Sequence, residues 1–473
     1  MNQLKSRSGK FLNDMLVYGV GTLGSKLITF LLVPLYTFFV PVAEYGYYDL
    51  CLTVILVALS VVCLQMNDGG FRFLVETTDN SLRTKIISTI YKVVMCNSAV
   101  VLGIALIVSM LTEIACVWLI VTMLVVMAFY EIAISTYRGL GYTKYYALAG
   151  IISSAVLFIF SLVLVVWLKM GIEGIFLSNI FARVISIACI ELKLKVINRY
   201  FSFGVTDIKA GRQILLYSLP LMINGLCWWV ISSSNKFFIE YYIGLEENGQ
   251  YAVVLKFATI LQIISVIFYQ AWQENALQQY NSPDRNTFFS SIFNNYIYAM
   301  SALVVVFCFV LKICYQWIVN CDYQQSVVYL YPLAFSSMVY AVSTFFDLGY
   351  QCSRRTARSM PSIMLAGVVS VLGNVVLIRY FGTFGIVASS ILSYSVLLVY
   401  RAIDTRKYFK ISISLKSWIA FMLVVVNGVL FYTIDSIILQ AGYLVIVIAV
   451  VLLFMPEVLR QKILSRILGG KRA

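Results

Sequence analysis

The charged residues of this chain fall in the gaps between long apolar segments, and this spacing constrains the fold more than any other feature. The hydrocarbon core of a bilayer is about 30 Å thick and requires roughly 20 apolar residues per helical span. About fourteen such segments follow one another, near residues 15–39, 46–66, 87–111, 114–137, 146–168, 172–194, 214–243, 251–276, 289–313, 326–349, 361–378, 383–401, 415–434 and 436–456. We therefore predict an all-α, polytopic membrane protein with about 14 transmembrane helices.

The cations are concentrated in alternate gaps. One set of gaps holds most of the Lys and Arg residues, including those near residues 5–10, 83–85, 193–212, 354–358, 406–410 and 460–472. The gaps that alternate with them, on the opposite side, are mainly acidic and hold only Lys169, Lys312 and Arg379. Loops on the cytoplasmic side of a membrane carry an excess of Lys and Arg. We therefore predict that both termini lie in the cytoplasm.

The composition excludes several classes of protein. With 61% apolar and 12% charged residues, the chain is too apolar for a soluble protein. The net charge of +14 lies in loops beside the membrane, so anionic membrane lipids are the expected partner and nucleic acid is not. Because the basic start runs into a full-length span, we expect no cleavable signal peptide.

Residue types and loop lengths argue against an enzyme. The sequence has no histidine, which excludes histidine general bases and imidazole zinc sites. Ten cysteines are scattered singly; Cys314 and Cys321 are close enough in sequence to pair, although small apolar filler is the simpler interpretation. The longest polar stretch, residues 193–212, is too short for a catalytic domain. We predict a transporter with no cofactor and no metal site.

One motif imitates a nucleotide site. Residues 19–24 spell G-x-G-x-x-G, and with Ser25 and Lys26 they nearly spell a phosphate-binding loop. Both motifs require a strand, a turn and a helix in an α/β domain. Here the run lies inside an apolar span, where small residues allow close helix packing. We do not expect nucleotide binding.

The chain repeats itself weakly. The paired segments are residues 44–48 (EYGYY) and 247–251 (ENGQY), 148–150 and 365–367 (both LAG), and 171–175 (GIEGI) and 382–386 (GTFGI). They predict two pseudo-symmetric six-helix lobes, residues 1–200 and 201–410, followed by two extra spans and a basic tail in residues 411–473. Parallel repeats of this kind are typical of transporters whose lobes rock about a central site. Chance placement of glycine remains the alternative.

Several motifs in the second half resemble those of a known family. They are residues 235–244 (NKFFIEYYIG), 247–256 (ENGQYAVVLK), 268–272 (FYQAW), 354–356 (RRT) and 374–386 (NVVLIRYFGTFGI). Their order and spacing resemble O-antigen flippases (Wzx type) of the multidrug/oligosaccharidyl-lipid/polysaccharide (MOP) exporter superfamily, over about residues 10–405. Two positions depart from the family: Asn235 stands where many relatives carry Asp, and Glu274 where they often have Pro. Any role for an acid at position 235 is therefore lost.

The resemblance implies a substrate and a setting. The family moves an undecaprenyl-diphosphate-linked oligosaccharide from the cytoplasmic to the periplasmic leaflet of the cell inner membrane by alternating access. A polysaccharide polymerase and a chain-length regulator are expected partners. No ATPase module is present in the sequence, so a substrate or ion gradient would supply the energy.

Cations near the bilayer centre are costly unless they face a cavity or a partner. The candidates for binding the diphosphate are Lys26, Arg183, Lys236, Lys256 and Arg72. Lys and Arg form charge-assisted hydrogen bonds with phosphate oxygens. Each also has a structural alternative, described next.

The structural alternatives differ from residue to residue. Lys236 precedes Glu240 by one helical turn and can form an ion pair with it. The side chain of Lys256 can extend toward the interface. Arg183 can pair with another helix, and Arg72 can be solvated or face lipid. Lys26, without a nearby acid, is the strongest candidate.

Four acids and three tryptophans complete the candidate set. Glu131, Glu191, Glu274 and Asp347 lie toward the cytoplasmic ends of their spans and are candidates for ion coupling or gating. Buried carboxylates can carry a coupling proton, but pairing with loop cations explains them equally. Trp228, Trp229 and Trp272 can stack on sugar rings or belong to the interfacial aromatic belt.

The sequence therefore predicts a flippase, with two rivals. A multidrug/cation antiporter of the same fold would favour acidic or aromatic pockets, whereas the charges deep in the spans here are mainly basic. A membrane glycan polymerase would need Arg-rich outer loops, which this chain lacks.

Overall fold

The computed structural model describes residues 28, 30–353, 355–434 and 436–454, without the side chains of residues 271, 274, 278, 356, 357 and 450–454. Every regular element in these residues is helical. Twelve helices in this part of the chain are long and apolar enough to span a membrane, and two shorter apolar stretches, Phe30–Phe39 and Ile437–Ala449, accompany them. The predicted all-α polytopic fold is confirmed, while the predicted orientation stays a prediction.

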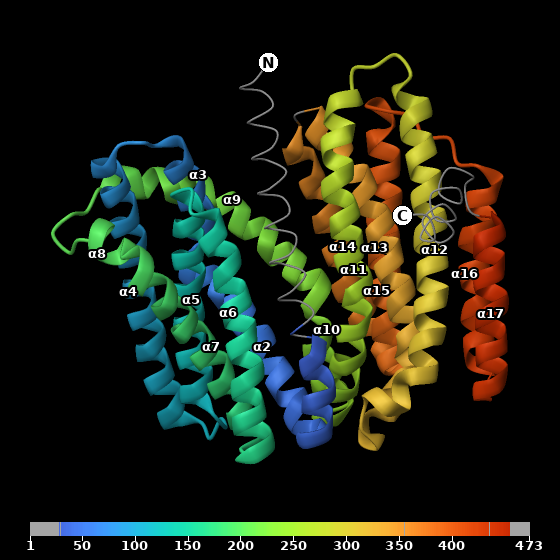
Figure 1. The fold of residues 1–473 in the computed structure, drawn as a ribbon, viewed down its shortest axis with the longest axis horizontal. Coiled ribbons are helices and arrows are strands. Elements are labelled where there is room, and N and C mark those ends of the chain that lie inside the picture. The colour runs from blue at the N-terminus through green and yellow to red at the C-terminus, as the bar shows by residue number, and fades with distance from the viewer. Residues whose placement is uncertain (1–27, 29, 354, 435, 455–473) are drawn as a thin grey trace, which may run out of the picture. The chain divides into compact units, whose positions relative to one another are not determined.

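The chain forms two compact units, Met1–Trp229 and Val230–Ala473. The lobe boundaries predicted at residues 200 and 410 stay a prediction. Within each unit most helices lie side by side with roughly parallel axes (Figure 1).

Unit 1 is built around α5, which packs on α2, α3, α4 and α7. Its elements are α2 (Val42–Cys63), α3 (Met66–Glu76), α4 (Asn80–Leu111), α5 (Val117–Gly139), α6 (Thr143–Ser161), the π-helical η1 (Leu162–Trp167), α7 (Gly171–Leu194), α8 (Val196–Tyr200) and all but the last turn of α9 (Ile208–Ser233).

Unit 2 is built around α13, which packs on α11, α12 and α15. Its elements are α10 (Asn235–Tyr242), α11 (Leu245–Gln279), α12 (Arg285–Ile318), η2 (Cys321–Tyr329), α13 (Leu330–Cys352), η3 (Thr356–Ser359), α14 (Met360–Phe381), α15 (Thr383–Asp404), η4 (Thr405–Lys407), α16 (Leu415–Thr433) and α17 (Ile437–Phe454). The last two helices pack against α12.

The Gly-x-x-Gly repeat has the same geometry in both units. Gly171 and Gly382 adopt φ values of +54° and +56°, which lie in the left-handed region that favours glycine. A Cβ atom at Gly174 would lie 3.2 Å from the Leu164 carbonyl, and one at Gly385 would lie 2.2 Å from the Leu377 carbonyl. In both units the motif therefore turns the chain and lets two consecutive helices approach closely.

A second repeat becomes visible once α5 and α13 are compared. Residues 133–142 read AISTYRGLGY and residues 341–350 read AVSTFFDLGY. Both segments lie at the end of the central helix of their unit. Gly139 in unit 1 corresponds to Asp347 in unit 2, which matters for the charges described below.

Two helices depart from the predicted spans. The second span ends at Cys63, where Leu64 and Gln65 adopt left-handed φ values of +48° and +52°, and α3 follows as a separate helix. The predicted span 214–243 is divided at Ser234 into α9 and α10.

Candidate ligand-binding residues

Arg183 lies in the middle of α7, about 18 Å along the helix from Gly171 at 1.5 Å per residue. Its Nη1 atom donates to the carbonyl oxygen of Asn179 at 2.9 Å and to the Asn179 side-chain oxygen at 3.0 Å. Asn179 in turn donates to the Tyr48 hydroxyl at 3.2 Å. One nitrogen of the guanidinium is thus hydrogen-bonded to Asn179 of the same helix.

The rest of the Arg183 guanidinium has no hydrogen-bond acceptor among the described residues. A guanidinium carries five N–H donors, and only Nη1 is used here. Glu131, on α5, lies within electrostatic range of Arg183 but forms no ion pair with it among the described residues. Nε and Nη2 of Arg183 are therefore available to an anionic ligand.

Arg401 on α15 is buried, and it is neutralised. Its Nη2 atom lies 3.1 Å from Oδ1 of Asp347 on α13, with the Arg401 side chain 2% exposed. Its Nε atom donates to the Ser362 hydroxyl at 3.2 Å. Charge-assisted bonds of this kind stabilise helix pairs in an apolar setting. The sequence prediction missed Arg401 because it lies at the end of its predicted span, where a cation is ordinarily solvated.

A polar chain extends from this pair. Gln351 donates to Oδ2 of Asp347 at 3.3 Å and to the Tyr269 hydroxyl at 2.6 Å, and it accepts from Gln273 at 2.6 Å. The Asp347 carboxylate thus has a direct cation partner on α15 and an amide partner on its own helix. Its candidacy for ion coupling stays a prediction, and its observed contacts are those of a structural ion pair.

Asn235 belongs to a buried amide network in unit 2. Its side-chain nitrogen donates to the Tyr251 hydroxyl at 3.2 Å and to the Ser390 hydroxyl at 2.9 Å. The Asn374 side chain donates to the Asn235 oxygen at 2.8 Å. This network joins α10, α11, α14 and α15 and satisfies Asn235 without any carboxylate.

The remaining candidate cations lie in different parts of the structure. Lys236 on α10 and Lys256 on α11 are both half-buried in unit 2. Arg72 on α3 is exposed; it pairs with Glu76 at 3.2 Å and its guanidinium lies 4.5 Å from the centre of the Tyr217 ring. Lys26 and the residues 19–24 lie outside the described residues.

Glu191 has two structural partners. It accepts from the Tyr137 hydroxyl at 2.9 Å and from the backbone N–H of Ile197 at 3.1 Å. It therefore connects α7 with α5 and with the first turn of α8. Glu131 is half-buried on α5, and the side chain of Glu274 lies outside the described side chains.

The three tryptophans have different environments. Trp272 is 4% exposed and stacks on Phe345 with ring centres 5.1 Å apart, while Phe289 meets it edge-on at 5.0 Å. Its faces are thus covered by aromatic neighbours. Trp229 donates its indole N–H to the Thr53 carbonyl at 3.1 Å, and Trp228 is half-buried beside it on α9.

Two other lysines donate hydrogen bonds to backbone carbonyl oxygens. Lys92 donates to the carbonyls of Phe203 and Val205 at 2.6 and 2.8 Å and to the Thr206 hydroxyl at 2.6 Å. Lys312 donates to the carbonyls of Phe431 and Ile434 at 2.5 and 2.8 Å. Lys92 fixes the loop before α9, and Lys312 caps the end of α16.

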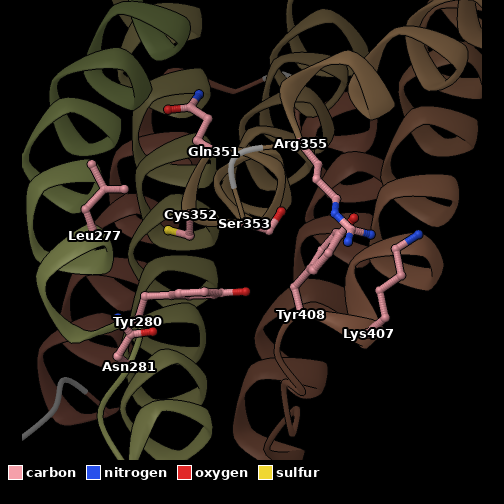
Figure 2. A pocket seen from close by; sticks show the side chains of 9 residues that line it. All are labelled: Leu277, Tyr280, Asn281, Gln351, Cys352, Ser353, Arg355, Lys407 and Tyr408. Atoms are coloured by element: carbon pink, nitrogen blue, oxygen red, sulfur yellow. The ribbon is translucent and has the colours of Figure 1, made fainter.

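Two cavities lie among the described residues of unit 2. One, of about 360 Å³, lies among α12, α16 and α17 and has mainly apolar walls that suit a hydrocarbon chain. The other, of about 720 Å³, opens where α11 and α13 end and η4 follows α15 (Figure 2). It is lined by cations, amides and phenols. Burial raises the pKa of Tyr280 in this second cavity, so its phenol remains a neutral donor.

Comparisons with known proteins place this arrangement in a wider group. A search of curated proteins finds no match. Among solved structures, the fold is similar to the inward closed conformation of Lipid II flippase MurJ, with a TM-score of 0.69 and 11% identity over 96% of this chain and 99% of that one. It is also similar to an inward-facing multidrug resistance MATE family transporter of the MOP superfamily, with a TM-score of 0.62 and 14% identity over 81% and 95% of the two chains.

A further similar structure is a MATE transporter of Vibrio cholerae, with a TM-score of 0.54 and 12% identity over 90% of this chain and 100% of that one. These likenesses show the fold. Residues 11–272 match the profile of a protein family described as polysaccharide biosynthesis protein. The chain therefore belongs to the polysaccharide biosynthesis protein family and has the fold of the MOP transporters.

Proposed function

We propose that this protein is a flippase that moves an undecaprenyl-diphosphate-linked oligosaccharide across the membrane by alternating access. The observation that carries the proposal is the combination of family and fold: a polysaccharide biosynthesis protein with a fold that matches a lipid II flippase over almost the whole of both chains. The likeness in fold supports transport of a lipid-linked sugar, and the family supports a role in making polysaccharide.

The charges support an anionic substrate. A charged side chain at the centre of a bilayer costs about 3 kcal/mol or more, so Arg183 needs a compensating role. Its Nε and Nη2 atoms have no acceptor among the described residues. A diphosphate would accept hydrogen bonds from these donors. Lys26, Lys236, Lys256 and Arg72 complete the proposed set of phosphate-contacting cations, with Trp228 and Trp229 as candidates for sugar contact.

The finer assignment follows from the resemblance and the loop charges. We propose an O-antigen or related surface glycan as the cargo, moved from the cytoplasmic to the periplasmic leaflet of the inner membrane, with both termini in the cytoplasm. A polymerase and a chain-length regulator would then use the product. No covalent bond changes during translocation, so the proposal requires no catalytic residue.

A deletion strain tests this proposal. The sidedness of lipid-linked oligosaccharide would be probed with a sugar-modifying reagent that does not cross the membrane. We expect complete repeat units to accumulate on the cytoplasmic face. Repeat units that reach the outer face but are not joined would contradict the proposal and favour a polymerase.

A multidrug antiporter is the second candidate, because the fold is also similar to MATE transporters. Cationic drugs require acidic or aromatic sites, whereas Arg183 places a cation in the middle of α7. A drug-sensitivity phenotype in the deletion strain without any glycan defect would reverse the assignment.

A further inference from the structure

The larger cavity of unit 2 lies at the ends of three membrane helices. Its walls come from the end of α11 and the residues after it, from the end of α13 and the residues after it, and from η4 with Tyr408 (Figure 2). Its volume is about 720 Å³, and it is open to the outside of the unit. Helices α13 and α15, of 23 and 22 residues, are about as long as the hydrocarbon core of a bilayer is thick, so their ends lie at the level of lipid headgroups when they span it. The cavity is therefore placed where phosphate groups are abundant.

The charge on its walls is positive. Arg355 and Lys407 line the cavity, and none of its nine lining residues is acidic. Lys407 is paired with Asp404, which leaves part of its hydrogen-bonding capacity available. Arg355 is exposed, and its guanidinium has no ion-pair partner among the described residues.

A buried donor also lacks a partner. Tyr408 is 8% exposed, and its hydroxyl has no hydrogen-bond partner among the described residues. In Figure 2 its ring points toward the same part of the cavity as the Arg355 side chain. The Lys407 ammonium lies 5.2 Å from the centre of the Tyr408 ring. A buried polar group without a partner is costly, so an acceptor bound here would relieve that cost.

The other polar side chains that line the cavity limit which ligands can bind there. Gln351 is fully occupied by Tyr269, Asp347 and Gln273. Asn281 and Tyr280 have no side-chain hydrogen bond among the described residues and face the cavity from the side opposite Arg355 (Figure 2). Two cations, one unpaired hydroxyl and further neutral donors form a site for a group that only accepts hydrogen bonds and carries negative charge.

We propose that this cavity binds a phosphate group, supplied by the headgroup of an anionic phospholipid or by soluble phosphate. The forked Arg355 guanidinium and the Lys407 ammonium hold the phosphate oxygens, and the Tyr408 hydroxyl donates to one of them. The site is separate from Arg183, which lies in the other unit, and the inference does not depend on the identity of the transported molecule.

The test uses the full chain in nanodiscs and follows the thermal unfolding midpoint, which rises when a ligand binds the folded state. In one arm, phosphatidylglycerol replaces phosphatidylcholine stepwise. In the other, pyrophosphate is added to phosphatidylcholine nanodiscs at constant ionic strength. The double variant R355Q/K407Q is compared with R406Q, which removes the neighbouring exposed cation of η4 that does not line the cavity.

We expect a saturable rise for the wild type and for R406Q, and at least about tenfold weaker binding for the double variant. R355K, which keeps the charge but not the fork, is expected to bind with intermediate strength. If the double variant loses the rise in unfolding midpoint only with phosphatidylglycerol, the phosphate belongs to a lipid. If it loses the rise only with pyrophosphate, the phosphate belongs to a soluble ligand. Equal weakening in R406Q, or no weakening in the double variant, would overturn the proposal.

Discussion

The two units share backbone motifs but differ in where each carries an arginine inside a long apolar helix. Counted from the Gly-x-x-Gly motif, Arg183 of unit 1 corresponds to Tyr394 of unit 2, and Arg401 corresponds to Ile190. In the central helices, Asp347 corresponds to Gly139. The repeated positions include those that turn and pack helices, whereas Arg183, Asp347 and Arg401 have no charged counterpart in the other unit.

The partners of the two arginines differ as well. Arg401 has a carboxylate 3.1 Å away and is almost fully buried. Among the described residues, Arg183 hydrogen-bonds only to the two oxygens of Asn179 on its own helix. A neutralised charge serves the fold, while a charge with unused donors can serve a ligand. This contrast predicts opposite phenotypes when each arginine is removed.

The largest expected effect follows from Arg401→Ala. The substitution leaves the Asp347 carboxylate without its cation, and breaking a buried pair in this way costs about 3 kcal/mol or more. We expect a strong loss of monodisperse protein and a lower midpoint of thermal unfolding in detergent. The double variant Arg401→Met with Asp347→Leu, which removes both charges, is expected to recover most of the loss. A single variant as stable as the wild type would show that Arg401 is not structural.

Arg183→Ala is expected to impair translocation while leaving stability nearly unchanged, the opposite of Arg401→Ala. The protein should fold with a nearly unchanged unfolding midpoint, because Arg183 hydrogen-bonds only within α7 among the described residues. Translocation should fall about 10- to 100-fold, the value of one or two charge-assisted hydrogen bonds. Transport of lipid-linked oligosaccharide in cells checks this, with Arg183→Lys as the charge-preserving control. Normal transport with a large loss of stability would reverse the roles assigned to the two arginines.

Asn235→Asp sharpens the comparison inside unit 2. The carboxylate cannot donate to Tyr251 and Ser390, as the amide does, and burial of the new charge adds a further cost. We expect a loss of about 2 kcal/mol in the free energy of unfolding. Asn235→Ala serves as the reference for losing the hydrogen bonds alone. If the Asp variant is more stable than the Ala variant, the network tolerates a carboxylate and this interpretation fails.

Glu191→Gln is expected to have the smallest effect. Its oxygen still accepts from the Tyr137 hydroxyl or the Ile197 N–H, so stability should fall by about 1 kcal/mol or less. Transport should be unchanged, because the observed contacts of Glu191 are structural. Tyr137→Phe controls for the loss of one bond. A transport defect in Glu191→Gln with normal stability would restore Glu191 as a coupling acid.

The membrane spans could be predicted because a helix that crosses lipid requires a long apolar run, which a sequence displays directly. Helix α3 could not be predicted in the same way. It contains Asn67, Asp68, Arg72 and Glu76, and the break before it falls at Leu64 and Gln65 rather than at glycine or proline. Left-handed residues of that kind depend on tertiary packing.

The candidate site was predicted only in part, for a related reason. Depth along a span made Arg183 a candidate, and this stays a prediction. The carboxylate that neutralises Arg401 comes from another helix, and pairing between distant helices is not visible in the order of residues. Tryptophan is a residue type that can stack on sugar rings, yet the neighbours Phe289 and Phe345 make Trp272 part of an aromatic core.

We propose that the protein translocates a diphosphate-linked lipid and that Arg183 contacts the diphosphate. The most direct measurement is the movement of a labelled undecaprenyl-diphosphate oligosaccharide between leaflets of proteoliposomes that contain the purified protein. We predict rapid equilibration with the wild type and with the double variant Arg401→Met with Asp347→Leu, and little movement with Arg183→Ala. Wild-type proteoliposomes that behave like protein-free liposomes, or an Arg183→Ala variant as active as the wild type, would contradict the account.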